Sequence, residues 1–559
     1  MKEKLTDIDF DEKIDMEATG IWALDTSHCV PSWTPLFAWY WGSLCDFGGN
    51  GAMEKISQPY AQSITMRLRR GGVYYGFFLA EDEEEVRQRE AKFREVMRPY
   101  IEDYEKNWEG VLEKEMMGHY ERLKKFDLKN ASAQDLWLHV EDCFAVTRRM
   151  WFLHVLGMYI TWCPFVLLER LCMQLLGIDD TDPNFLKLIT GFDNKLFQVD
   201  RRMWLLSKKA NELGLKEIFL GSESKDVIPI LENSNSGKKW LAEFREFLEE
   251  DGWRTQRRDE FLLPTWIEDP TPAIEIIKIF IKKGGEFDPD KHREKAVKER
   301  EEAEKRILSR IPDEQKEWFT KLLKVAQKAG PYGESHTYYC EDYCFSLTRM
   351  AFLEIARRYV KAGTIDSPDD IFFLLPEEIR KVIYIPQHYN LRPVVKRRRG
   401  EWETWCKEPN PPFILKEGVT PNDITQRLIK TADPIFFKAL LGVMPRVKPE
   451  LKADLYGIIG SPGFAEGPAR VILEEKDLSQ VMDGDILVAV NTAPSWTPVF
   501  HLIKGAVIDR GGSLAHAAIM GREFGLPIVI NVFKGTQMIR TGQQIRVDAN
   551  LGAVFILDK

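Results

Sequence analysis

The stretch GGSLAHAAIMGREFGLPIV, residues 511–529, combines a glycine turn, a single histidine and the start of a helix. Gly511 and Gly512 permit backbone conformations that other residues avoid, and they let a bulky group approach the main chain. The first N–H groups of the following helix, and its dipole, favour an anion at that place. A neutral imidazole at His516, in a turn expected to face solvent, suits attack on a phosphorus atom. A packed histidine in a tight turn is the structural alternative.

The size and composition of the chain predict a globular protein of several domains. At 559 residues it is too long for one hydrophobic core, so we expect three or four domains. Hydrophobic residues make up 44% and charged residues 30%, as in globular proteins. The net charge of −9 gives no reason to expect nucleic acid as a partner.

The cysteines and one apolar segment predict a reduced, cytoplasmic protein without a membrane partner. The eight cysteines contain no CxxC pair, and the spacing Cys340-x3-Cys344 lacks a second ligand pair. We therefore expect neither a disulfide framework nor a metal site. Residues 151–168 are apolar, but they contain His154 and Pro164, which favours a buried helix over a membrane span.

The N-terminal part, residues 1–445, has a mostly helical pattern. Residues 81–126 show the spacing of an amphipathic helix pair, and 288–311 that of a charged, largely solvated helix. A further helix is expected to end at Gly363. The region is expected to form one or two subdomains, and a division would fall near 270–290.

From about residue 452 the pattern changes to short β-rich runs separated by Gly, Pro, Asn and Asp. This change predicts a compact α/β domain over 458–559, preceded by a hinge at 446–457. Two helices are expected in it, one opening at Thr497-Pro498 and the other at His516.

A short sequence occurs on both sides of this change. VPSWTPLF (30–37) is similar to APSWTPVF (493–500). Each has a Thr that could cap a helix and a Pro at the first helical position. Because the flanking sequences diverge at once, we interpret the pair as a shared way to start a helix and not as a duplicated domain.

An aromatic cluster follows the first copy. It suggests a pocket for a flat acceptor molecule, and a buried aromatic core is the structural alternative. The candidate pocket residues are Trp33, Phe37, Trp39 and Trp41.

The segment around His516 resembles the phosphorylation motif of the swivelling phosphohistidine domain in phosphoenolpyruvate-utilising enzymes. Residues 460–471 and 484–500 share the resemblance. It implies a swivelling β/β/α domain at the C-terminus, in which His516 carries a phosphoryl group. Members of the family usually have a hydroxyl residue directly before the histidine, where this chain has Ala515. The phosphate-binding residues expected from the motif are Gly511, Gly512, Ser513 and Arg522.

The helical part is similar, over residues 332–379, to the acceptor-binding domain of rifampicin phosphotransferases. The resemblance implies a multidomain fold with a mainly α-helical acceptor-binding region before the swivelling domain. Glu334, His336 and Asp342 match polar positions of that domain. His336 is the residue that we expect to take the proton from an attacking hydroxyl.

Cations are needed on the acceptor side to neutralise the transferred phosphoryl group. Arg357 and Lys361 are four residues apart and lie on one helix face. Arg349 is eight residues before Arg357 and is expected on roughly the same face. The alternative is that these are ordinary charges of a solvated helix face.

The resemblance predicts a phosphotransferase of the dikinase type, one subunit of a complex. We find the pattern neither of an ATP-grasp domain nor of a phosphoenolpyruvate-binding barrel. As in phenylphosphate synthase, ATP and Mg²⁺ are therefore expected on a separate ATP-grasp subunit, and a phenol-type aromatic alcohol is expected as the acceptor. This chain would hold no cofactor tightly. The alternative function, motivated by Ala515, is a catalytically weak regulatory or binding protein that keeps the fold.

Overall fold

The computed structural model describes two compact units of the chain. The described residues are 22–24, 32–69, 72–80, 82–255, 260–284, 288–407, 435, 449–473, 475–492 and 496–558. The first unit comprises the residues up to 157, 257–264 and 336–433, and the second comprises 158–256, 265–335 and 434–559. Helices α6 (Ala133–Leu176) and α15 (Tyr332–Thr337) each continue from one unit into the other.

The first unit is built mainly from helices, as the sequence predicts. Its α-helices, besides its parts of α6 and α15, are α2 (Pro35–Ser43), α3 (Asn50–Ile56), α4 (Glu83–Glu102), α5 (Met117–Lys124), α16 (Tyr343–Ala362), α17 (Pro376–Val382) and α18 (Arg392–Trp405). Its π- and 3-10-helical turns are η1 (Leu44–Gly49), η2 (Glu105–Glu109), η3 (Leu112–Met116), η5 (Tyr338–Asp342), η6 (Pro368–Phe373) and η7 (Pro386–His388). α16 ends as predicted, because Gly363 adopts a left-handed φ of 76° at the C-cap.

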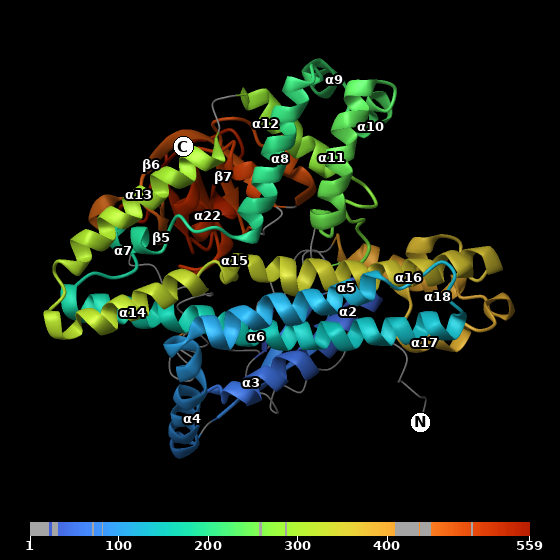
Figure 1. The fold of residues 1–559 in the computed structure, drawn as a ribbon, viewed down its shortest axis with the longest axis horizontal. Coiled ribbons are helices and arrows are strands. Elements are labelled where there is room, and N and C mark those ends of the chain that lie inside the picture. The colour runs from blue at the N-terminus through green and yellow to red at the C-terminus, as the bar shows by residue number, and fades with distance from the viewer. Residues whose placement is uncertain are drawn as a thin grey trace. The chain divides into compact units, whose positions relative to one another are not determined.

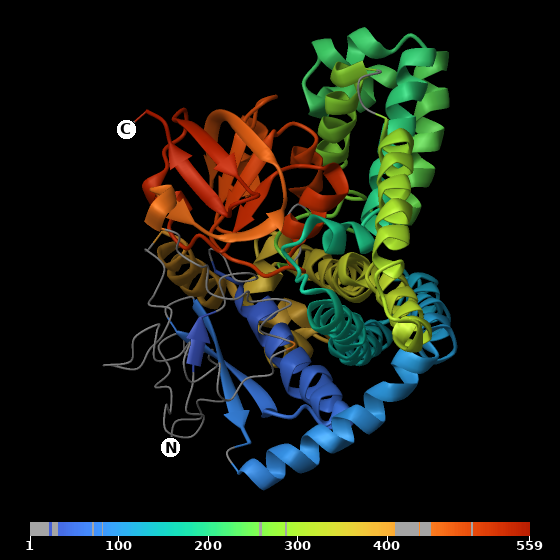
Figure 2. The same cartoon turned by 90° about the vertical axis from the view of Figure 1, so that its left-hand side faces the viewer.

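A three-stranded antiparallel sheet in the order β1-β3-β2 accompanies these helices (Figure 2). Its strands are β1 (Trp22–Leu24), β2 (Ala61–Arg69) and β3 (Gly72–Leu79). β2 and β3 pair with Thr65 opposite Gly76. The helical pattern did not predict this sheet. Its signal is the run of β-branched and aromatic residues on either side of Gly71-Gly72, a typical hairpin turn.

Helix α6 is the one described helix long and apolar enough, by length and composition, to cross a membrane. In its most apolar window, 78% of the residues are buried inside the protein. The predicted buried helix over 151–168 is therefore confirmed. None of the seven cysteines that the structure describes forms a disulfide.

The helical part of the second unit packs around a cluster of large apolar side chains. Its helices, besides the ends of α6 and α15, are α7 (Pro183–Leu188), α8 (Lys195–Glu212), α9 (Lys216–Gly221), α10 (Ser224–Leu231), α11 (Asn235–Asp251), α12 (Thr271–Lys283), α13 (Pro289–Leu308) and α14 (Asp313–Ala329). Trp240, Phe244 and Ile277 are buried where α8, α11 and α12 meet. α13 is the charged helix predicted over 288–311.

The described strands of the second unit form an eight-stranded sheet in the order β4-β11-β10-β6-β7-β8-β9-β5. The strands are β4 (Leu455–Tyr456), β5 (Ile458–Ser461), β6 (Phe464–Ile472), β7 (Ile486–Ala489), β8 (Gly505–Ile508), β9 (Ile528–Ile530), β10 (Gln544–Asp548) and β11 (Ala553–Ile556). β6 to β9 run parallel, and the other pairs are antiparallel. Every residue of β7, β8 and β9 is buried, because apolar side chains cover both faces of the parallel part.

Short helices accompany this sheet, with α22 beside the strands (Figure 1). They are η9 (Pro449–Leu451), η10 (Glu475–Gln480), α21 (Thr497–Phe500), α22 (His516–Phe524) and α23 (Gly535–Met538). α21 and α22 begin at Thr497 and His516, which confirms the two predicted helices and the β-rich C-terminal fold. The predicted limits at 445 and 458 and the break near 270–290 stay predictions, and part of the proposed hinge lies outside the described residues.

Candidate functional site

Parallel strands bring His516 and Thr492 to the same edge of the sheet. His516 is the first residue of α22, which connects the parallel neighbours β8 and β9. Thr492 follows the carboxyl end of β7, which lies beside β8 on its other side. The carboxyl ends of neighbouring parallel strands meet at one edge, where open α/β sheets commonly bind ligands. The two loops therefore converge there.

The turn before His516 depends on one of its two glycines. Gly511 has a φ of 138°, and a Cβ atom there would come within 2.9 Å of the Ala515 Cβ. Gly512 is not among the residues with positive φ. Ala515 is the N-cap of α22 in an extended conformation, with φ −70° and ψ 150°, and has no side-chain cap.

Two threonine hydroxyls contact the two nitrogens of the imidazole. Thr492 Oγ1 lies 2.8 Å from His516 Nδ1, and Thr497 Oγ1 lies 3.3 Å from His516 Nε2. The Phe500 ring meets the imidazole edge to face, with the centroids 5.6 Å apart. If Nδ1–H donates to Thr492, the neutral ring keeps the lone pair of Nε2 for a bond to phosphorus. Ala515, directly before His516, has no hydroxyl, and the two hydroxyls near the imidazole come from Thr492 and Thr497.

The imidazole is more buried than the sequence predicts. We expected a turn that faces solvent, whereas the His516 side chain is only 7% exposed. The Glu334 carboxylate covers it from the end of the helical region, with Oε2 3.9 Å from His516 Nε2. Glu334 itself is 4% exposed. The structure therefore brings one predicted acceptor-side residue to the predicted carrier histidine.

The other residues predicted to bind phosphate make contacts inside the same unit. Ser513 donates a 2.5 Å hydrogen bond to Asp180, and Arg522 donates to the Gly460 carbonyl at 3.0 Å. Burial lowers the pKa of Arg522 to about 10. The nearby carboxylates of Glu523, Asp180 and Glu334 act in the opposite direction and raise this pKa. Arg522 therefore lies in an acidic, buried surrounding.

A small cavity of about 40 Å³ adjoins this group. Glu334, Arg522 and Glu523 supply the ionisable part of its lining, and Asn194 and Gln327 contribute amides. Burial raises the pKa of Glu523 to about 7. A cavity of this size, with several polar groups in a largely apolar lining, has room for an ordered water molecule.

The predicted cations of α16 do not share one environment. Arg357 and Lys361 are exposed, and Arg357 pairs with Glu354 at 3.3 Å. Arg349 is buried, donates to the Phe261 carbonyl and lies over the Phe372 ring at 5.1 Å. The expectation of a common face is therefore not met for Arg349, because eight residues at about 100° each leave it roughly 80° around the helix from Arg357.

The remaining polar candidates belong to the first unit. Asp342 is buried in η5, and His336 is partly buried near the end of α15. The His336 ring lies 4.8 Å from the His154 ring, between centroids. Sequence reasoning had not connected His154 or the neighbouring Glu341 with His336.

The aromatic residues expected to line an acceptor pocket form a packed core. Trp33, Phe37 and Trp41 are at most 1% exposed, with ring centroids 5.0 to 5.9 Å apart. Phe37 also contacts the Phe345 ring at 5.5 Å, and the partly buried Trp39 packs on Phe144 at 5.5 Å. The aromatic core, which was the alternative, describes this cluster, because the rings fill the space among themselves.

Sequence reasoning missed Thr492, Thr497 and Asp180 as neighbours of this site. Thr497 was interpreted as a helix cap, but Trp496 holds the cap position and the hydroxyl contacts His516. The available signal for Thr492 was its place just after an apolar β-rich run, since ligands commonly bind beyond the ends of strands in open α/β sheets. Asp180 lies more than 300 residues from Ser513, and no local pattern connects them.

Two family models match the chain. The mobile domain of phosphoenolpyruvate-utilising enzymes matches residues 481–552, which contain His516, Thr492 and Thr497. The fourth domain of rifampicin phosphotransferase matches residues 154–334, which end at Glu334. These segments of the chain are therefore similar to domains of phosphoenolpyruvate-utilising enzymes and of rifampicin phosphotransferase, and both residues of the contact between His516 and Glu334 lie in the matched segments.

Individual relatives agree with these models. The chain is 27% identical over 383 residues to an uncharacterized phosphotransferase, YvkC, of Bacillus subtilis (68% of this chain, 44% of the relative). It is 30% identical over 330 residues to rifampicin phosphotransferase of the same organism (58% and 35%). It is 26% identical over 559 residues to chondramide synthase of Chondromyces crocatus (97% and 14%). The chain thus spans less than half the length of these curated relatives.

Proposed function

We propose that this chain is a phosphotransferase subunit in which His516 carries a phosphoryl group to a hydroxyl acceptor. The observation that carries the proposal is the contact of Thr492 and Thr497 with the two nitrogens of His516, at the N-terminus of α22. The match of this segment to the mobile domain of phosphoenolpyruvate-utilising enzymes supports it. Relatives that are named phosphotransferases support it further.

The first step would place the phosphoryl group on Nε2. ATP with Mg²⁺, bound on a separate ATP-grasp subunit, would supply the group. Nε2 forms the bond to phosphorus as a P–O bond of ATP breaks, and the resemblance implies that AMP and phosphate are released. Nδ1–H stays hydrogen-bonded to Thr492, and the α22 dipole favours the added negative charge. The phosphoramidate formed is an activated donor for a weak nucleophile.

The second step would move the group to a phenol-type aromatic alcohol, as in phenylphosphate synthase. The P–N bond breaks as the phenol oxygen forms the new P–O bond, and the phenol proton passes to a base. His336 is the base that we propose. Arg357 and Lys361 are exposed cations, which fits a role in neutralising the incoming phosphoryl group.

The burial of His516 supports movement of its domain. An imidazole that is 7% exposed has to be uncovered before a donor on another chain can reach it. The contacts that would break are the 2.5 Å bond of Ser513 to Asp180 and the approach of Glu334 to the imidazole. We place the hinge at 446–457.

The competing function, a catalytically weak regulatory or binding protein that keeps the fold, stays the alternative. The feature that motivates it is Ala515, which provides no hydroxyl next to the histidine. Thr492 and Thr497 supply hydroxyls to the imidazole instead.

The acceptor step can be tested with the chain alone. The full chain is loaded with labelled phosphoramidate, freed of reagent, and then given phenol or, as a matched control, cyclohexanol. We expect the label to leave His516 and appear as phenyl phosphate, with little transfer to cyclohexanol. Label that stays on His516, or that is lost only to water at the same rate with and without phenol, would contradict the acceptor class but not the carrier role.

A further inference from the structure

His336 and Glu341 are brought to one side of the chain by an unusual helical turn. In an α-helix, residues five apart point about 140° away from each other. Here the turn η5, which directly follows α15, is a π-helix, and the Tyr343 N–H bonds to the Tyr338 carbonyl five residues earlier. A π-turn stacks residues five apart, and such turns occur frequently at functional sites. The turn η5 begins two residues after His336 and contains Glu341, so the wider turn reduces the angle between the two side chains.

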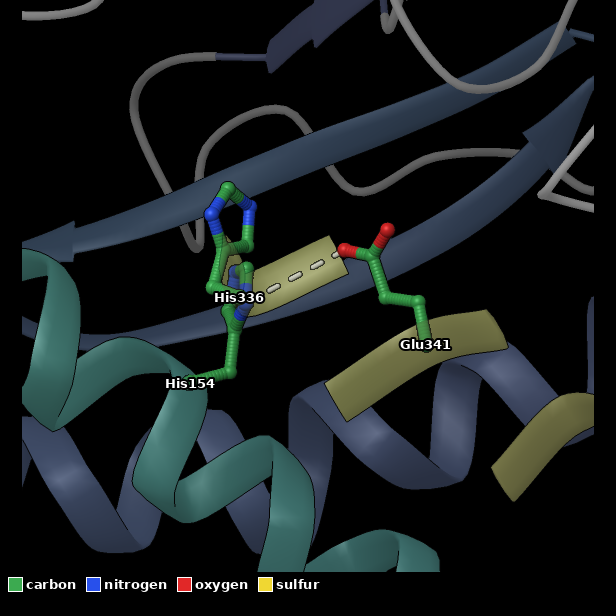
Figure 3. A group of neighbouring side chains, drawn as sticks. All are labelled: His154, His336 and Glu341. Carbon is green, nitrogen blue, oxygen red and sulfur yellow. Dashed lines mark ion pairs between the residues drawn. The ribbon is translucent and has the colours of Figure 1, made fainter. Parts of the chain in front are cut away.

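His154 completes the group from another helix, α6 (Figure 3). The Glu341 carboxylate points toward the two imidazoles, with Oε1 3.9 Å from His154 Nδ1. The two rings have their centroids 4.8 Å apart. Trp151 stacks on the His154 ring at 4.5 Å and fixes its plane. All three residues belong to the first unit.

The three side chains are spaced for a shared ion. One ligand atom from each lies within 4.8 Å of the others, and among the described residues this is the one such group of His, Cys, Asp or Glu. Metal bonds of about 2.0–2.2 Å separate tetrahedral ligands by about 3.4 Å, so small rotations of the side chains bring them into place. Glu341 is 1% exposed and His154 is 16% exposed, so the site is enclosed but reachable.

The donor set selects the kind of ion. Two imidazoles and one carboxylate are the ligands of many three-ligand zinc sites, which keep one position for water or another oxygen. Mg²⁺ prefers all-oxygen surroundings and is a poor match. The sequence predicted no metal site, because His154 lies more than 180 residues before His336 and the π-turn is not visible in the pattern.

We propose that His154, His336 and Glu341 bind a divalent transition-metal ion of the zinc class, with an open position for an oxygen ligand. This site goes beyond the proposed transfer by His516 and does not rest on it. The two proposals assign His336 different roles, because its imidazole cannot serve as the base while the same nitrogen is bound to the ion.

Metal titration of the full, chelator-treated chain tests the proposal. We expect one Zn²⁺ per chain by calorimetry, and one Co²⁺ with the visible absorption of a low-coordinate nitrogen and oxygen site. His336→Ala and Glu341→Gln should each weaken binding by more than about 100-fold. His388→Ala, at an exposed histidine of η7, should bind as tightly as the wild type. An unchanged affinity in the site variants, or equal competition by Mg²⁺, would overturn the proposal.

A second measurement covers variants that fold poorly. Because an ion that binds only the folded chain stabilises it, the thermal midpoint of the wild type should rise with Zn²⁺ concentration and stay constant with Mg²⁺. If Zn²⁺ leaves the wild-type thermal midpoint and the calorimetric signal unchanged, the three residues do not form a metal site, and only the contact between His154 and Glu341 remains.

Discussion

The two copies of Ser-Trp-Thr-Pro place the same residues in two different roles. In both copies the Trp is buried and the Pro stands in the first turn of a helix, α2 or α21. Thr34 holds the cap position of α2, with φ −67° and ψ 153°. Thr497 is already helical, and Trp496 is the cap. The start of a helix was predicted correctly for both copies. The cap position of the Thr was predicted correctly for Thr34 but not for Thr497.

The partners of the two threonines differ most. The Thr34 hydroxyl and N–H each donate a 2.7 Å hydrogen bond to Glu260, a carboxylate that is 3% exposed. The Thr497 hydroxyl instead contacts the imidazole of His516 at 3.3 Å. The same tetrapeptide thus contacts a buried structural carboxylate in one unit and the candidate carrier histidine in the other. What a residue contacts, and not the local motif, decides its role.

The largest effect on stability is expected from replacing Glu260, the carboxylate that binds Thr34 in the first copy. Glu260 also accepts from the backbone N–H groups of Phe261 and Leu262, so Glu260→Ala leaves several buried donors without this partner. We expect unfolding of the first unit to become easier by about 3 kcal/mol or more, as measured by denaturant titration. Glu377→Ala, at an exposed carboxylate, should change little. A normal midpoint for Glu260→Ala would show that this contact of the first copy does not stabilise the unit.

A second carboxylate, the partly buried Glu523, is expected to change its charge near neutral pH. Its pKa is raised to about 7 by burial, so its contribution to stability is present below pH 4.5 and is lost as the pH rises through 7. Glu523→Gln should therefore stabilise the second unit at pH 8, by up to about 3 kcal/mol, and have little effect at pH 4. The control is Glu317→Gln, at an exposed position. Equal effects of Glu523→Gln at both pH values would refute the raised pKa.

The threonines themselves give the most direct comparison. Loss of the 2.8 Å contact in Thr492→Val should slow loading of His516 by about fivefold, since a hydrogen bond contributes about 1 kcal/mol. Thr497→Val should slow loading less, because its contact with the imidazole is longer, at 3.3 Å. Thr34→Val should lower stability by about 1–3 kcal/mol and leave the loading rate unchanged. Quenched time courses of His516 phosphorylation measure the loading rate of the three variants, and melting curves measure their stability. If Thr34→Val slows loading as much as Thr492→Val, the division of roles is wrong.

The smallest effects are expected at the exposed cations of α16. Arg357→Ala and Lys361→Ala should change stability by less than about 0.5 kcal/mol, because a surface pair such as Arg357–Glu354 contributes little. Each should slow transfer from His516 to phenol by up to about tenfold without changing the loading step. A slower loading step would instead assign them to the donor side. No effect on either step would make them ordinary surface charges.

The sequence predicted the parts of the molecule that depend on local patterns. The helices at Gly363, Thr497 and His516, the buried α6 and the β-rich C-terminal fold follow from periodicity, capping residues and glycine turns. The motif also located His516 as the carrier candidate. The contacts that surround it were not predictable, because Glu334 and Asp180 approach from segments far away in the chain. The burial of Arg349 and the packing of Trp33 likewise depend on neighbours that only the fold supplies.

The central claim is that His516 carries a phosphoryl group, and mapping of the phosphorylated residue tests it most directly. The full chain is treated with phosphoramidate, and acid-labile phosphate is located by mass spectrometry under alkaline conditions. The matched variants are His516→Gln and His501→Gln, the latter at a buried histidine of the same mobile-domain segment. We expect one phosphate per chain on His516, its retention in His501→Gln and its loss in His516→Gln. Phosphate spread evenly over the histidines, or undiminished in His516→Gln, would contradict the account.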